Sequence, residues 1–135
     1  GLDSRLLMGL AAQSLTCELD RDPESRYILL CGGGNNGGDG YALAFLLSQR
    51  GRKVILFEKS NSPKTEASSF FRKQAEKSKN IDWHSLPKFS KFHFQKNDFV
   101  VDALQGDGLY ADRRRWCPCG GKFRGGFDCS RQQDA

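Results

Sequence analysis

Hydrophobic positions along residues 1–112 follow two different periods, and the two periods alternate. Three segments carry apolar residues at three- and four-residue steps, which predicts amphipathic helices at 2–19, 41–50 and 65–79. Three short runs, of which 27–31 is continuously apolar and the other two mostly apolar, predict buried strands at 27–31, 53–57 and 99–104. Helices that alternate with buried strands predict an α/β fold built on a mostly parallel, doubly wound sheet.

Other segments fit these periods less cleanly. Residues 81–84 can form a short strand, whereas 85–97 are apolar in places but follow no regular spacing. Residues 32–40, with the sequence GGGNNGGDG, are expected to form a loop because six of the nine are glycines. The period of the first predicted helix rests on Leu6, Leu7, Leu10, Ala11, Ser14 and Leu15.

Positive charge is concentrated at one end of the chain. The 135 residues have a formal net charge of +5, of which residues 113–135 contribute +4 with six basic and two acidic side chains. We therefore expect one domain over residues 1–112, followed by a divergent basic tail rich in Gly and Cys. Cys117, Cys119 and Cys129 in this tail match zinc-ligand spacing poorly. No apolar run approaches the ~20 residues of a membrane span, so no membrane partner is expected. The tail holds only a single short RGG-like sequence, so no nucleic-acid partner is expected either.

The first glycine-rich segment matches a dinucleotide-binding fingerprint. Gly32, Gly34 and Gly37 have the GxGxxG spacing, between a predicted strand and a predicted helix. Glu58 ends the second strand 21 residues after Gly37, where a ribose-binding acid belongs in an NAD domain. One hypothesis is therefore an NAD-binding oxidoreductase domain.

Polar residues of the same segment favour a different ligand. Asp39 follows the third glycine of the fingerprint closely, and a carboxylate there would repel a pyrophosphate. Asn35, Asn36 and Asp39 together offer oxygen atoms that suit a hard cation or ligand hydroxyl groups. The alternative is that Asn35 and Asn36 only accommodate left-handed backbone angles in a turn.

A second glycine-rich segment follows the third predicted strand. Asp102 lies near the carboxyl end of this strand, and Gly106 and Gly108 come shortly after it. Ligands bind at the carboxyl ends of strands in open α/β sheets, so the two segments are expected to face one crevice. Asp102 could then share a cation or a ligand hydroxyl with Asn36. The alternative is that Asp102 caps the following turn.

Two longer motifs carry a resemblance to a known family. Residues 28–54 have the pattern IxxCGxGNNGGDGYxxAxxLxxxGxxV, and residues 100–109 have the pattern VVDALxGxGL. In these motifs the chain resembles the NAD(P)H-hydrate epimerases, the YjeF N-terminal domain family, over about residues 1–112. The resemblance implies a Rossmann-like three-layer α/β/α fold and a homodimer, in the cytoplasm or, in a eukaryote, in mitochondria.

Members of this family are isomerases of damaged nicotinamide cofactors. They interconvert the R and S epimers of hydrated NADH and NADPH, so the resemblance makes the nucleotide a substrate. It implies potassium as the cofactor, with Asn36 and Asp102 as ligands. The residues that it implies in substrate binding are Asn35, Asn36, Gly37, Gly38, Asp39, Gly106, Asp107, Gly108, Leu109, Tyr110, Ala111 and Asp112.

The resemblance stops before the family's catalytic motif. The family continues with an Asp-Ile-Pro-Ser-Gly motif whose Asp is the proposed acid/base, and this sequence has no such motif. Asp128 is the residue most similar in context to the Asp of this motif, but no strand is predicted before it, so the catalytic residue stays unassigned. We expect the fold to be incomplete in its C-terminal half. A catalytically inactive nucleotide-binding remnant is therefore a further alternative to an active epimerase.

Overall fold

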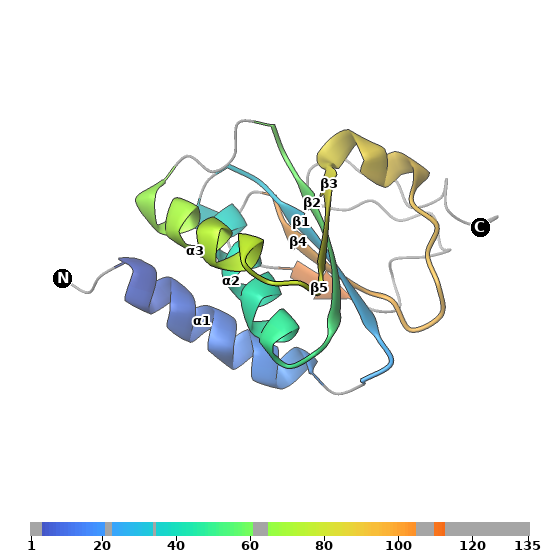
Figure 1. Cartoon of the computed structure of the whole chain (residues 1–135), viewed down its shortest axis with the longest axis horizontal. Coiled ribbons are helices and arrows are strands. Elements are labelled where there is room, and N and C mark those ends of the chain that lie inside the picture. Colours follow the sequence, from blue (N-terminus) through green and yellow to red (C-terminus); the bar gives the residue numbers. More distant parts are fainter. Residues whose placement is uncertain (1–3, 21–22, 34, 61–64, 105–109, 113–135) are drawn as a thin grey trace.

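The computed structural model describes residues 4–20, 23–33, 35–60, 65–104 and 110–112, with the backbone alone for 4, 35–37 and 110–112. These residues form one sheet, with three α-helices on one face and a 3-10 helix on the other (Figure 1). In chain order the elements are α1 (Ser4–Leu19), β1 (Arg26–Cys31), α2 (Asn35–Gln49), β2 (Lys53–Glu58), α3 (Glu66–Glu76), β3 (Ile81–Ser85), η1 (Leu86–Lys91), β4 (Phe99–Ala103) and β5 (Tyr110–Asp112).

The sheet has the strand order β3-β2-β1-β4-β5. β1 to β4 run parallel, and Leu29 of β1 lies in register with Leu56 of β2 and Val101 of β4. This confirms the predicted α/β class and the mostly parallel sheet. β5 was not predicted and pairs antiparallel with β4. The chain goes from β1 to β2 on one side and reaches β4 on the other, so the order reverses between the ends of β1 and β4, where such folds bind ligands.

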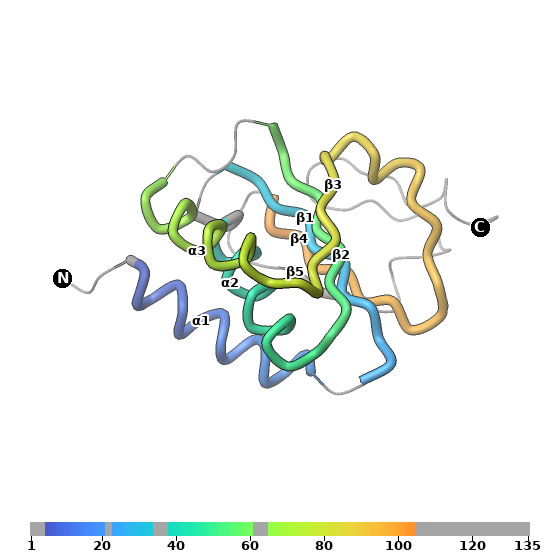
Figure 2. Tube along the Cα trace, in the orientation of Figure 1, coloured from blue at the N-terminus to red at the C-terminus, as the bar shows by residue number. Residues whose placement is uncertain are grey.

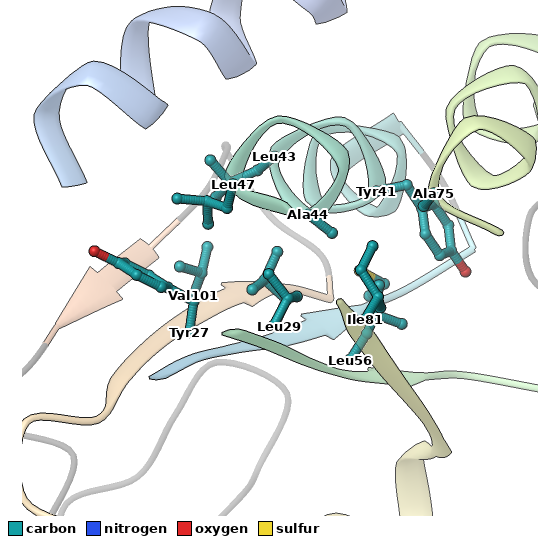
Figure 3. Packing of buried hydrophobic residues seen from close by; sticks show 12 residues of the cluster. Tyr27, Leu29, Tyr41, Leu43, Ala44, Leu47, Leu56, Ala75, Ile81 and Val101 are labelled. Carbon is teal, nitrogen blue, oxygen red and sulfur yellow. The ribbon is translucent and has the colours of Figure 1, made fainter. Parts of the chain in front are cut away.

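The core is split between the two faces of the sheet because side chains alternate along each strand. Tyr27 and Leu29 point toward α2, where they meet Leu43 and Leu47 (Figure 3). Ile28 and the other alternate residues pack on the opposite face. All of 27–31 is fully buried, as the continuous apolar run predicted.

Phenylalanines of the irregular segment cover that opposite face. Phe89 lies on η1 and contacts Phe57 of β2 edge to face, with ring centroids 5.2 Å apart. Figure 2 follows the trace from η1 back to β4 on this side of the sheet. Arg26 binds both oxygens of the Asp98 carboxylate at 2.8 and 2.6 Å, which ties the end of this segment to β1. A 3-10 turn and an extended segment explain why the sequence showed no single period here.

The face of α1 that is buried is not the one whose leucines gave the helical period in the sequence. Leu6, Leu7 and Leu10 are each about half exposed, whereas Met8 and Ala12 are buried against α2 and α3. The helices approach closely here because small residues lie between them. No helix within the described ranges has the length and apolar character needed to cross a membrane.

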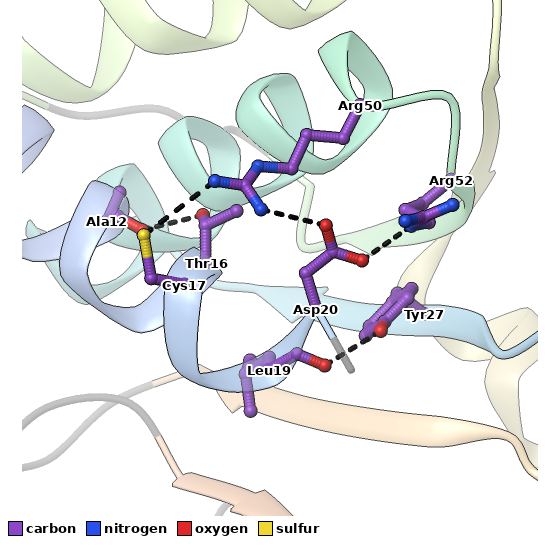
Figure 4. A network of polar contacts seen from close by, with 8 residues as sticks. All are labelled: Ala12, Thr16, Cys17, Leu19, Asp20, Tyr27, Arg50 and Arg52. Carbon is purple, nitrogen blue, oxygen red and sulfur yellow. Dashed lines mark hydrogen bonds and ion pairs between the residues drawn. The ribbon is translucent and has the colours of Figure 1, made fainter. Parts of the chain in front are cut away.

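The C-terminal end of α1 is fixed by a polar network (Figure 4). Arg50 and Arg52, which follow α2, both donate hydrogen bonds to the buried Asp20 carboxylate. Burial alone would raise the pKa of Asp20, but the bonds from Arg52 and Arg50 lower it below its usual value. Gly51 lies between these arginines with a φ of 79°, which fits the prediction that glycine ends this helix.

Candidate functional site

The carboxyl ends of β1 and β4 touch at the reversal point of the sheet. The Gly32 amide after β1 donates a hydrogen bond to the Ala103 carbonyl oxygen of β4 at 3.0 Å. A Cβ atom on Gly32 would lie 2.1 Å from the Leu104 carbonyl oxygen, so only glycine fits. The segments that follow the two strands therefore start side by side, whereas the shared ligand crevice stays a prediction.

α2 begins much earlier than the sequence predicted. Residues 35–40 were expected to be loop, but they form the N-terminal part of the helix. Tertiary packing explains this result. A Cβ on Gly38 would lie 2.6 Å from Met8 Sδ, and one on Gly40 would lie 2.6 Å from Cys31 Sγ. The close contact of the helix with its neighbours outweighs the helix-propensity cost of about 1 kcal/mol per glycine. Asp39 consequently lies in the helix, just beyond its first turn.

The predicted substrate-binding residues fall into three groups in the structure. Asn35, Asn36, Gly37, Gly38 and Asp39 lie in the N-terminal part of α2, where the amides of the first turn are not bonded within the helix and can bind an anion. Tyr110, Ala111 and Asp112 form β5 beside β4. The third group lies outside the described residues: Gly106, Asp107, Gly108 and Leu109.

Asp102, the predicted partner of Asn36, is a fully buried residue of β4. Its Oδ1 atom accepts a hydrogen bond from the Leu104 amide at 3.0 Å. The structure thus contains the turn-capping bond that the sequence offered as the alternative role. This bond occupies one oxygen of the carboxylate and leaves ion binding by Asp102 as a prediction.

Asp39 is the titratable residue of α2 nearest its N-terminus. It is half-buried, and burial raises its pKa from 3.8 to about 6. A carboxyl group with this pKa exchanges its proton near neutral pH, which is the property required of an acid/base group. Asp39 therefore differs chemically from the fully ionised carboxylate that the sequence led us to expect.

This raised pKa gives a stability prediction of fixed sign. The folded state holds the Asp39 proton more tightly than the unfolded state, so stability is lost as the pH rises from about 4 to about 6. We expect Asp39→Asn to raise the free energy of unfolding at neutral pH by about 1 kcal/mol, after allowance for partial exposure. Urea unfolding at neutral and acidic pH measures this gain, which should shrink as the pH falls through the window.

Asp82→Asn is the control, because the Asp82 side chain is 71% exposed and its pair with His84 lies at the surface, where such a pair contributes little to stability. It should leave stability unchanged at both pH values. A gain from Asp39→Asn that is equal at neutral and acidic pH would contradict the assignment of the effect to the Asp39 proton.

Glu58, the candidate ribose-binding acid, is engaged within the protein. Arg72 of α3 donates to both of its carboxylate oxygens at 2.8 and 2.7 Å, and the Tyr41 hydroxyl donates to Oε2 at 2.7 Å. Burial would raise the pKa of Glu58, but the Arg72 and Tyr41 hydrogen bonds lower it. A ribose would have to break this ion pair, which counts against the oxidoreductase hypothesis. The sequence carried no signal for the Arg72 partner, because the residues lie on different elements.

Metal-ligand clusters are not found in the described ranges, where no three or more His, Cys, Asp or Glu side chains come together. Cys117, Cys119 and Cys129 lie outside those ranges. Of the described cysteines, Cys17 is exposed and Cys31 is buried, and neither forms a disulfide.

Comparisons with known proteins identify the family of this chain and proteins with a similar fold. The family model described as YjeF-related protein N-terminus matches residues 5–116. An NAD(P)H-hydrate epimerase of Rhodobacter capsulatus is 38% identical over 89 residues, which are 61% of this chain and 37% of that protein. An NAD(P)H-hydrate epimerase of Pirellula staleyi is 32% identical over 126 residues, which are 84% of this chain and 53% of that protein. The crystal structure of yeast ynu0, YNL200c, superposes with a TM-score of 0.62 at 26% identity, covering 78% of this chain and 49% of that one. The chain thus spans about half or less of these relatives' length.

Proposed function

Because this chain belongs to the family of YjeF-related protein N-termini, we propose that it binds hydrated NADH and NADPH between α2 and the carboxyl ends of β1 and β4. The observation that carries this proposal is the contact of Gly32 with Ala103 and Leu104 beside the N-terminus of α2. The names of the epimerases from Rhodobacter capsulatus and Pirellula staleyi support the choice of ligand.

In this proposal the two glycine-rich segments have complementary roles. Residues 35–39 receive the nucleotide at the N-terminus of α2, where unpaired amides and the helix dipole favour negative charge. Residues 106–112 contact it from the β4 side. The family relationship also supports a homodimer.

Potassium would be held at the same place by Asn36 and Asp102. The donor set fits the ion, because Asp102 is a buried carboxylate and the Leu104 carbonyl oxygen lies close to Gly32, so hard oxygen ligands are gathered here. Bound potassium would supply positive charge next to the phosphates. The Asp102 carboxylate would coordinate the ion and balance its positive charge in a buried position.

Epimerisation itself requires proton transfer, because the hydroxyl on the nicotinamide ring must leave or the ring must open. A positioned acid/base typically contributes 10²–10⁴ in rate. The Asp-Ile-Pro-Ser-Gly motif that supplies this group in the family is absent from the sequence. We therefore propose that residues 1–135, taken by themselves, bind the hydrated cofactor but catalyse its epimerisation poorly.

The test uses the purified 135-residue chain and hydrated NADH. Calorimetric titration should detect binding of the hydrate, with NAD bound no more tightly. Chromatography should show that the R epimer converts to the S epimer at the spontaneous rate. No binding of the hydrate would refute the substrate class. Acceleration that is lost in Asp39→Asn would refute poor catalysis and identify Asp39 as the acid/base.

A further inference from the structure

The N-terminal part of α2 is packed on three sides. Successive residues of a helix point in directions about 100° apart, so four consecutive residues sample the whole circumference. Gly38 is directed toward Met8 of α1 and toward α3, and Gly40 toward β1 and β4. Tyr41 is directed toward the end of β2, where Glu58 lies. Asp39 therefore points to the side nearly opposite Tyr41.

Of the contacts made by Gly38, Gly40 and Tyr41, only that of Tyr41 is a side-chain hydrogen bond, which has a preferred direction. The Tyr41 side chain is fully buried, and its hydroxyl donates to Glu58 Oε2 at 2.7 Å. Arg72 holds the same carboxylate through two hydrogen bonds, and its guanidinium lies 5.1 Å from the centroid of the Trp83 ring. Trp83 in turn stacks on Tyr41 at 6.2 Å between ring centroids. These contacts connect α2, β2, β3 and α3. We call the three hydrogen-bonded residues Tyr41, Glu58 and Arg72 the Tyr41 clamp.

The contacts of Gly38 and Gly40 do not by themselves prevent α2 from rotating about its axis. Gly38 and Gly40 have no side chains, so they limit how closely the helix approaches its neighbours but do not hold it by directional bonds. Rotation of α2 about its axis is opposed by the buried Leu43 and Leu47 further along the helix and, in the turn that carries Asp39, by the hydrogen bond from Tyr41 to Glu58. Such a rotation would move Asp39, because both residues belong to one turn of a rigid helix.

We propose that Tyr41, Glu58 and Arg72 are positioning residues that fix the orientation of Asp39 toward the bound nucleotide. This inference rests on the proposed function for the ligand, although the geometry of the clamp does not. Glu58 thus acts at the site through Tyr41 and α2, and not through a ribose, as the fingerprint had suggested.

A double-mutant cycle separates positioning from general stability. Tyr41→Phe keeps the ring on Trp83 and removes only the hydroxyl. We expect it to weaken the binding of hydrated NADH about tenfold. In an Asp39→Asn background, the same substitution should have almost no further effect on binding, because the group that it positions is already altered. An equal loss of affinity in both backgrounds would overturn the proposal.

Tyr27→Phe is the matched control. Tyr27 is also a fully buried tyrosine, and its hydroxyl donates to the Leu19 carbonyl oxygen at 2.8 Å, away from the site. It should lower the melting temperature to a similar extent as Tyr41→Phe but leave the affinity unchanged. Equal loss of affinity in the two variants would contradict a specific positioning role.

A measurement without nucleotide distinguishes failure of this inference from failure of the proposed function. Carbon NMR of the Asp39 carboxyl group should show that its titration midpoint shifts in Tyr41→Phe and in Glu58→Gln, but not in Tyr27→Phe. An unshifted midpoint in both clamp variants would overturn the clamp. Absence of nucleotide binding by the unmodified chain, together with a shifted midpoint, would refute the proposed function and support the clamp.

Discussion

Replacing Gly32 with alanine is expected to lower the free energy of unfolding by about 3 kcal/mol, within the upper range of overpacking effects. The new Cβ would lie 2.1 Å from the Leu104 carbonyl oxygen and 2.9 Å from its carbonyl carbon. Both are backbone atoms, which cannot move aside as the end of a flexible side chain can. The ends of β1 and β4 must separate, so the Gly32–Ala103 hydrogen bond is lost as well. Chemical denaturation followed by circular dichroism measures the change.

Gly9→Ala serves as the control for this experiment. Gly9 lies within α1, and the nearest atom to an added Cβ is Phe71 Cζ at 3.5 Å, an ordinary contact distance. The substitution should be neutral or stabilise the protein by up to about 1 kcal/mol, because alanine favours helix more than glycine does. A Gly32→Ala protein that is as stable as Gly9→Ala would show that the ends of β1 and β4 are not in contact.

Replacing Asp102 with alanine is expected to weaken the binding of hydrated NADH in potassium buffer by about tenfold or more, which corresponds to about 1.4 kcal/mol. The loss follows if Asp102 is the charged oxygen ligand that holds the ion near the nucleotide. Binding by the variant should then no longer depend on potassium, which calorimetry in potassium and in tetramethylammonium buffers measures. Unchanged affinity, or potassium dependence that persists, would remove Asp102 from the ion site.

Two further substitutions separate ion binding from the local turn. Asp102→Asn retains an oxygen that can accept the Leu104 amide bond but removes the charge. It should lose nearly as much affinity as Asp102→Ala; full recovery would mean that Asp102 serves only the turn. Asp98→Asn weakens the pairing of a buried carboxylate with Arg26 at the amino ends of β1 and β4, whereas Asp102 lies near their carboxyl ends. It should lower stability while potassium dependence is retained.

The strands were predictable because their signal is local. A run such as 27–31 has to be buried on both faces wherever it lies, and the structure buries it completely. The start of α2 was not predictable from local propensity, since six glycines in nine residues favour a loop. What makes the helix possible at Gly38 and Gly40 is the position of Met8 and Cys31, which only the assembled fold supplies.

The contact between the carboxyl ends of β1 and β4 was predictable, but the electrostatics beside it were not. Parallel strands end at one edge of a sheet, so the contact of Gly32 with Ala103 followed from the order of elements. The raised pKa of Asp39 depends on burial, and the pairing of Glu58 depends on Arg72 in a helix that packs beside it. Neither property is encoded in spacing along the chain.

The missing space for side chains at Gly38 and Gly40 affects how this motif can be used to infer ancestry and activity. Selection for folding alone favours both glycines, because a Cβ at Gly40 would lie 2.9 Å from the Ala103 Cβ and one at Gly38 would displace the Met8 side chain. A lineage that lost its enzymatic activity but kept its fold would therefore keep much of NNGGDG. Burial disfavours the charged form of Asp39, so folding does not require this carboxylate. Drift at Asp39 among descendants would record the loss of activity, whereas the glycines would record only the persistence of the domain.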